Sequence, residues 1–166
     1  MVFSGNRYLV VWQDERIVPN NDAPNIFGAR VQIDGVVVDP TGLPIAVAPG
    51  QQSAPAVAFD GTQWLVAWAD VRSGQASNVS ATRVSQQGTI LDPAGIQLTR
   101  ALGDQYAPIA SWDGVTFFVA WADYRQLDGQ IVGTRVATDG GVLDPDGLSI
   151  APADGQSQPS LTRGSG

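Results

Sequence analysis

Two patterns that combine aspartate with arginine are the first candidates for chemistry in this chain. In the pattern Asp-x-Arg the two charged residues stand two positions apart, so on a β-strand they share a face and can form a bidentate ion pair. The pattern occurs at Asp14/Arg16, Asp70/Arg72 and Asp123/Arg125. It fits a structural bridge to a neighbouring turn, or a ring of polar groups around a ligand. Because it recurs in every unit of the chain, we favour the structural interpretation.

A second arginine follows each Asp-x-Arg pair at a short distance along the chain. These residues are Arg30, Arg83 and Arg135, and a valine follows each of them. Guanidinium groups that face a central channel would form an anion-binding ring. The same residues also fit strand positions that stack on tryptophan or pair with aspartate-rich turns. We favour the second interpretation and keep the three arginines as candidates for ligand binding.

The residue types that are missing restrict the chemistry further. The chain has no lysine, histidine or cysteine, fifteen of its sixteen acidic residues are aspartate, and its net charge is −7. This composition excludes a histidine general base, a cysteine nucleophile, a Schiff-base lysine and a zinc site of the Cys/His type. A net negative chain also repels phosphate backbones, so we expect no nucleic-acid partner.

The acidic residues themselves show no catalytic or metal-binding pattern. The three Asp-Pro-x-Gly segments, which begin at Asp39, Asp92 and Asp144, lack the alternating acidic spacing of a calcium loop. Proline at the second position of a turn explains them instead. A glycoside hydrolase needs two carboxylates with separate roles, and no pair here is distinguished from the others. We therefore expect no catalytic residue, no metal and no cofactor.

The elements that position these residues come from an internal repeat of about 53 residues. Residues 56–72 align with residues 109–125, and residues 3–16 give a third copy. Each unit begins with Gln-x-x-Pro, and the last such segment starts at Gln156. Residues 159–162 therefore read as the first strand of a unit that continues at Phe3. The single domain 1–166 then consists of three units, approximately 159–163 plus 1–50, 51–103 and 104–155.

Within a unit the apolar residues alternate as in β-strands. In the second unit Trp64, Val66 and Trp68 share one face while Leu65 and Ala67 share the other, so the strand is apolar on both faces. The equivalent tryptophans Trp12, Trp68 and Trp121 are predicted core residues. Asp-Gly pairs at 60–61 and 113–114 predict hairpin turns. Residues 79–84 and 131–136 read as a third strand, and 89–91 and 142–143 as a fourth. The segments 43–45, 96–98 and 148–150 continue that strand or form a short extra one.

A tandem repeat of four-stranded units, each of roughly 50 residues and apolar on both faces, is typical of β-propeller blades. The motif Leu-Val-x-Trp-x-Asp-x-Arg, at residues 9–16 and 65–72, resembles the tandem repeats of bacterial propeller proteins, some of them predicted to be secreted. The resemblance covers essentially the whole chain. It implies an all-β propeller, and a secreted or cell-surface location for a longer parent protein. It does not imply one activity, because propellers carry many functions.

Three blades are too few to close a ring, since known propellers have about four or more. An open arc exposes sheet edges and apolar faces. We therefore expect identical chains to assemble head to tail, as a six-bladed dimer or a nine-bladed trimer. We see no signal-peptide pattern and no apolar run of roughly 20 residues, so we expect no membrane span. The ends of the sequence suggest an excised or designed fragment.

The function that this reading favours is a non-enzymatic scaffold or interaction module, with a glycan or a protein as a possible ligand. The alternative is a multivalent carbohydrate-binding propeller, because sugars stack on exposed aromatic rings. Its candidate residues are Trp112, which replaces the Phe59 of the second unit, and Tyr124, which replaces Val71. A glycoside hydrolase-like enzyme is the least favoured function.

Overall fold

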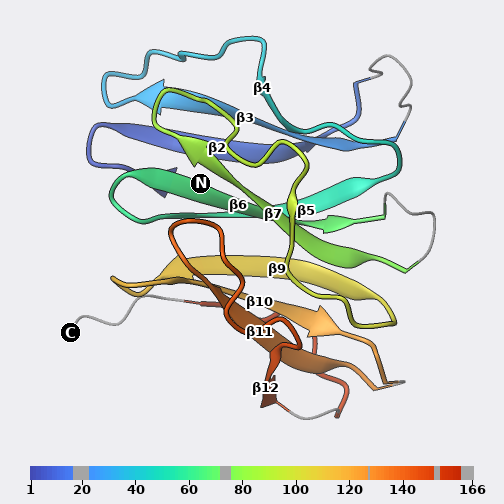
Figure 1. The fold of residues 1–166 in the computed structure, drawn as a ribbon. Coiled ribbons are helices and arrows are strands. Elements are labelled where there is room, and N and C mark those ends of the chain that lie inside the picture. The colour runs from blue at the N-terminus through green and yellow to red at the C-terminus, as the bar shows by residue number, and fades with distance from the viewer. Residues whose placement is uncertain (17–22, 72–75, 127, 152–153, 162–166) are drawn as a thin grey trace.

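The computed structural model of this chain is all-β and consists of three four-stranded antiparallel sheets (Figure 1). The structure describes residues 1–16, 23–71, 76–126, 128–151 and 154–161. The first sheet contains β1 (Val2–Phe3), β2 (Arg7–Asp14), β3 (Asn25–Gln32) and β4 (Leu43–Ala46). The second contains β5 (Gln52–Phe59), β6 (Gln63–Asp70), β7 (Asn78–Ser85) and β8 (Ile96–Gln97). The third contains β9 (Gln105–Trp112), β10 (Phe117–Asp123), β11 (Gln130–Val136) and β12 (Leu148–Ala151).

Each sheet is a meander in which strands that follow each other in sequence are hydrogen-bonded neighbours. The hairpin between β5 and β6 turns at Gly61, whose φ of 105° lies in a region that side-chain-bearing residues rarely adopt. Gly114 has the same role between β9 and β10, with φ of 106°. The predicted Asp-Gly hairpins are therefore confirmed. The predicted third strands correspond to β7 and β11.

The predicted fourth strand at residues 89–91 and 142–143 is wrong. These segments contribute only the isolated bridges Val84–Ile90 and Val136–Val142 to the third strand of each sheet. The fourth strands are instead β4, β8 and β12, which follow the Asp-Pro-x-Gly turns. That turn returns the chain to the opposite end of the third strand, where it pairs for two to four residues.

The first strand of the second and third sheets carries a bulge at the Gln-x-x-Pro segment. Pairing of β5 with β6 shifts register between Ser53 and Ala56, and the intervening Ala54 has a positive φ of 50°. Ala107 adopts a φ of 49° at the equivalent position of β9. An extra residue in one strand of a pair is the usual form of a β-bulge.

The three sheets are stacked face to face, with the second sheet between the other two (Figure 1). One core cluster joins Leu9, Ile26 and Ile45 of the first sheet to Trp64, Val66 and Trp68 of the second. The other joins Leu65, Ala67 and Leu98 of the second sheet to Phe117, Val119 and Trp121 of the third. The central strand β6 is consequently apolar and buried on both faces, as its sequence predicts.

Each outer sheet has one face on which no other sheet packs. On the first sheet this face carries Tyr8, Val10 and Trp12, which are exposed or half-buried although the equivalent residues of β6 and β10 are buried. On the third sheet it carries Ile150, which is 52% exposed, whereas the equivalent Leu98 is fully buried. The two ends of the stack therefore present different apolar faces. The described part of the chain contains no helix long and apolar enough to span a membrane.

Candidate functional site

The Asp-x-Arg pair lies at the C-terminal end of the second strand in each outer sheet. Arg16 donates to both carboxylate oxygens of Asp14, from Nε at 2.7 Å and from Nη2 at 2.6 Å. Its Nη1 donates to the carbonyl of Thr41 at 2.6 Å, and its guanidinium lies 4.3 Å from the centre of the Phe27 ring. The pair thus connects the end of β2 to the Asp-Pro-x-Gly turn of its own sheet.

The third sheet repeats these contacts. Arg125 donates to both oxygens of Asp123 at 2.8 Å, and its Nη1 donates to the carbonyl of Asp146 at 3.3 Å. In the second sheet Trp68 donates to Asp70 at 3.0 Å, and Arg72 lies outside the described residues. Each of the three aspartates accepts the indole N–H of the tryptophan two positions before it. In the two outer sheets, the hydrogen bonds of the Asp14/Arg16 and Asp123/Arg125 side chains join residues of one sheet.

The network lowers the pKa of two of its carboxylates, Asp14 and Asp123, and so keeps them ionised. Hydrogen bonds from the Arg16 side chain lower the pKa of Asp14 well below its ordinary value, against the opposing effect of burial. Burial acts to raise the pKa of Asp123, but hydrogen bonds from Arg125 and Trp121 outweigh it and the pKa is lowered. A carboxylate with a lowered pKa is a poor proton donor or acceptor near neutral pH, because proton transfer needs a pKa near the working pH.

The second set of arginines pairs with the Asp-Pro-x-Gly turns. Arg30 binds Asp39 through Nε at 2.8 Å and Nη2 at 2.7 Å, and its backbone N–H donates to the same carboxylate. Arg83 binds Asp92, and Arg135 binds Asp144, with the same geometry. Each guanidinium is therefore already engaged by a carboxylate of its own sheet. Such an arrangement leaves little positive charge for a free anion.

Two of these arginines also connect neighbouring sheets. Nη1 of Arg30 donates to the carbonyl of Gln86 in the second sheet at 3.2 Å, and Nη1 of Arg83 donates to that of Thr138 in the third at 3.0 Å. Gln86 and Thr138 occupy the same position in the turn after the third strand. Sequence reasoning missed these contacts, and the only signal was the constant spacing between each arginine and the following turn.

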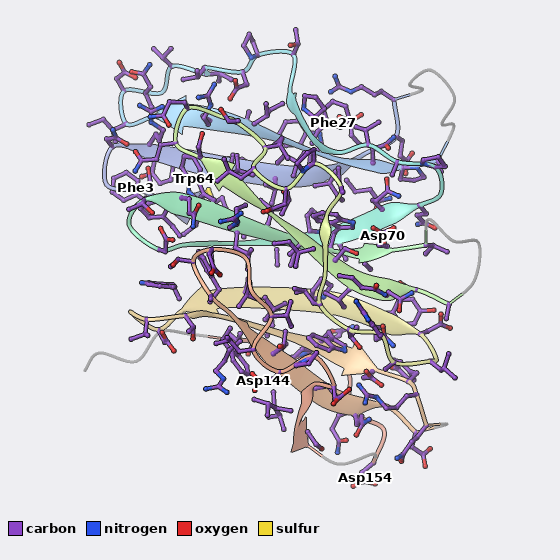
Figure 2. All side chains as sticks on the ribbon, viewed as in Figure 1. Phe3, Phe27, Trp64, Asp70, Asp144 and Asp154 are labelled. Carbon is purple, nitrogen blue, oxygen red and sulfur yellow. The ribbon has the colours of Figure 1, made fainter. Side chains whose placement is uncertain are left out.

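A cavity of about 400 Å³ lies at the other end of the sheets, between the ends of the first strands. The aromatic rings of Phe3, Phe59 and Trp112 line it, one from each sheet and all at the equivalent position. Figure 2 shows Phe3 at the end of the sheets where Trp64 lies, with Asp70 at the opposite end. The cavity and the Asp-x-Arg network are thus separated by the length of the strands.

Asp60 supplies the charged group of this cavity. Its Oδ1 accepts hydrogen bonds from the backbone N–H groups of Thr62 and Gln63, at 2.7 and 2.8 Å. Its Oδ2 is buried and has no hydrogen-bond partner among the described residues. A buried oxygen without a partner costs free energy unless a ligand or water satisfies it. Sequence analysis predicted Asp60 only as a turn residue.

Of the predicted ligand-binding residues, only Trp112 lines this cavity. Its ring packs on that of Phe117, with centroids 4.9 Å apart. Tyr124 lies at the other end of β10, where its ring meets the edge of Tyr106 at 5.9 Å. The structure therefore does not bring the two predicted aromatic candidates together.

No family model, curated protein or solved structure matches this chain.

Proposed function

We propose that the three sheets are consecutive blades of a β-propeller and that the chain is a non-enzymatic scaffold or interaction module that self-assembles into a closed ring. The observation that carries the proposal is the difference between the two ends of the stack. The first sheet presents the face of Tyr8, Val10 and Trp12, and the third presents the face of Phe118 and Ile150. Inside the chain, faces of these two kinds pack on each other twice.

The open face of the first sheet and the open face of the third sheet are therefore of the two kinds that pack against each other inside the chain. A contact between the end of one copy and the beginning of the next is heterologous, and repeated heterologous contacts generate a ring when the rotation closes. Burying these faces removes exposed apolar surface from water, which is the main driving force for association. Three blades per chain predict a dimer of six or a trimer of nine.

Light scattering coupled to size-exclusion chromatography tests the proposal. We expect a species of twice or three times the mass of one chain, at micromolar concentration and with a β-rich circular dichroism spectrum. A well-folded monomer under these conditions would contradict the self-assembly.

A multivalent carbohydrate-binding module is a second candidate, and the cavity at Asp60 favours it. Three aromatic rings line this cavity, and such rings bind sugars by stacking. A glycan array on the intact protein tests this candidate, with Trp112→Ala as the matched variant. Binding that this variant abolishes supports the candidate, and an array without signal counts against it.

A further inference from the structure

The first strand of the first sheet is much shorter than its two equivalents. Strand β1 pairs through Val2 and Phe3 with Leu9 and Tyr8 of β2. The equivalent strands β5 and β9 each have eight residues and extend to the aspartate at the end of the second strand. On this edge of β2, the positions from Val10 to Asp14 therefore pair with no strand in the described part of the chain. An open edge of this kind is a template for another strand.

Residues 156–161 have the sequence and backbone geometry of the first-strand segment that is missing from the first sheet. Gln156 and Pro159 stand where Gln52 and Pro55 stand in β5. Gln158 has a positive φ of 55°, against 50° for Ala54 and 49° for Ala107 at the same position of the bulge. Positive φ is uncommon for residues other than glycine. Residues 157–161 thus match the bulged first strand although they pair with no strand in the described structure.

The same segment already lies where the first strand of a further sheet would begin. The backbone N–H of Gln52 donates to the carbonyl of Pro24 in the preceding sheet at 2.9 Å, and that of Gln105 to Ser77 at 2.8 Å. The backbone N–H of Gln156 donates to Gly129, the equivalent residue of the third sheet, at 3.0 Å. The open edge of β2 belongs to the first sheet, at the opposite end of the stack (Figure 1). Within one chain, the segment and the edge lie apart.

A second set of contacts between neighbouring sheets runs in the same direction along the stack. Arg30 and Arg83 each reach a carbonyl of the following sheet, whereas Arg135 makes no such contact among the described residues. The Arg135 side chain is 50% exposed, against 12% for Arg30. The position equivalent to those carbonyls in the first sheet is Ile33, which is 70% exposed. An unused donor on the third sheet thus matches an open position on the first.

We propose that residues 156–161 of one copy add to the edge of β2 in a second copy as the missing part of its first strand. By the register of β5 on β6, Gln156 lies opposite Asp14, Ser157 opposite Gln13, and Leu161 opposite Val10. These six residues and the two of β1 together fill the eight positions of β5. Arg135 then donates to the carbonyl of Ile33 in the second copy. This inference rests on the proposed self-assembly, and it names the segment that joins the copies.

A disulfide test uses the absence of native cysteine. Opposite residues of an antiparallel pair have Cβ atoms about 4.5–5.5 Å apart, near enough for a disulfide to form with a small adjustment. We expect the double variant Gln13→Cys/Ser157→Cys to give interchain disulfides on mild oxidation, seen as covalent multimers in non-reducing gels. The matched control is Gln87→Cys/Ser157→Cys, because Gln87 is also exposed but lies in a turn of the second sheet. Equal cross-linking in both variants, or none in the first, overturns the proposed register.

A backbone variant separates strand addition from face-to-face stacking. Proline fixes φ near −65°, so Gln158→Pro cannot form the bulge, whereas Gln158→Gly can. We expect the proline variant to elute as a monomer at concentrations where the glycine variant and the unchanged chain are oligomeric. If the proline variant keeps the oligomeric mass, strand addition is wrong while the self-assembly stands. If the unchanged chain is itself a monomer, the self-assembly fails as well.

Discussion

The indole of Trp121 and the carboxylate of Asp123 are joined by a hydrogen bond of 3.1 Å from Nε1 to Oδ2. Both side chains are fully buried, and the same carboxylate accepts two hydrogen bonds from the side chain of Arg125 and one from its backbone N–H. The relationship recurs at Trp12 and Asp14, and again at Trp68 and Asp70. A repeated aspartate that at first suggests chemistry is therefore a buried connector. It satisfies the only polar atom of the tryptophan side chain, which is buried at Trp68 and Trp121 and half-buried at Trp12.

Replacing the repeated aspartate by alanine should destabilise the protein more in the third sheet, where the aspartate and its arginine are better buried, than in the first. We expect Asp123→Ala to lower the free energy of unfolding by about 3 kcal/mol, because it leaves the Trp121 N–H and the Arg125 guanidinium without their partner. Asp14→Ala is the matched variant. Its arginine is 45% exposed, against 28% for Arg125, so water replaces more of the lost contact and the effect should be smaller. Urea unfolding followed by tryptophan fluorescence measures both, and equal losses would contradict this ranking.

The protein should lose stability in acid. Hydrogen bonds from arginine side chains lower the pKa values of Asp14, Asp39 and Asp144 in the folded state. A lowered pKa in the folded state means that the unfolded chain binds protons more readily, so the stabilisation is complete above the unfolded value of about 4 and is lost as the pH falls below it. Thermal unfolding between pH 7 and pH 2 checks this. We expect a constant melting temperature down to about pH 5 and a steady fall below it.

The glycines at positive φ should differ in their tolerance of a side chain. A Cβ at Gly103 would lie 2.7 Å from the carbonyl oxygen of Tyr124 and 2.8 Å from the Cα of Arg125, whereas a Cβ at Gly61 would meet nothing within 4 Å. Gly61→Ala should cost only the left-handed backbone conformation, about 1–2 kcal/mol. Gly103→Ala adds a clash with backbone atoms and should cost about 3 kcal/mol or more. Chemical denaturation of the two variants gives the comparison, and a larger loss for Gly61→Ala would refute it.

Variants of Arg83 and Arg135 should distinguish an effect on the stability of one chain from an effect on association between chains. Arg83 joins Asp92 to the neighbouring sheet, so Arg83→Ala should cost about 2 kcal/mol of unfolding free energy. Among the described residues the hydrogen bonds of the Arg135 side chain all go to Asp144, so Arg135→Ala should cost less in the Gln158→Pro background, which we expect to be monomeric. In the unchanged background the same substitution should weaken association. Sedimentation over a dilution series measures this, and an unaltered dissociation constant would argue against the contact with Ile33.

Much of the fold follows from the sequence because the signals are local. The alternation around Trp64 predicts a strand that is buried on both faces, since successive side chains of a strand point to opposite sides. The pair Asp60-Gly61 predicts a hairpin because glycine readily adopts the positive φ of the turn. A repeated pattern at a fixed spacing then predicts repeated sheets. These features need only the chemistry of neighbouring residues.

The fourth strand could not be chosen in this way. Residues 89–91 and 96–98 are both short and apolar, and local propensity does not distinguish them. Which segment pairs as the fourth strand depends on the turn at Asp92. The Asp92 carboxylate binds Arg83 of the third strand, and after this turn the chain pairs with the other end of that strand. This is a contact between side chains that are nine residues apart.

The sequence by itself determined the repeat, the strands within it, their turns and the reactions that missing residue types exclude. Only the tertiary structure decided the partners of Arg30, Arg83 and Arg135, the buried oxygen of Asp60, and the difference between the two ends of the stack. Equivalent residues such as Leu98 and Ile150 have nearly the same chemistry, yet one is buried and the other is half exposed. Burial is a property of what packs against a residue, and no local pattern contains that information.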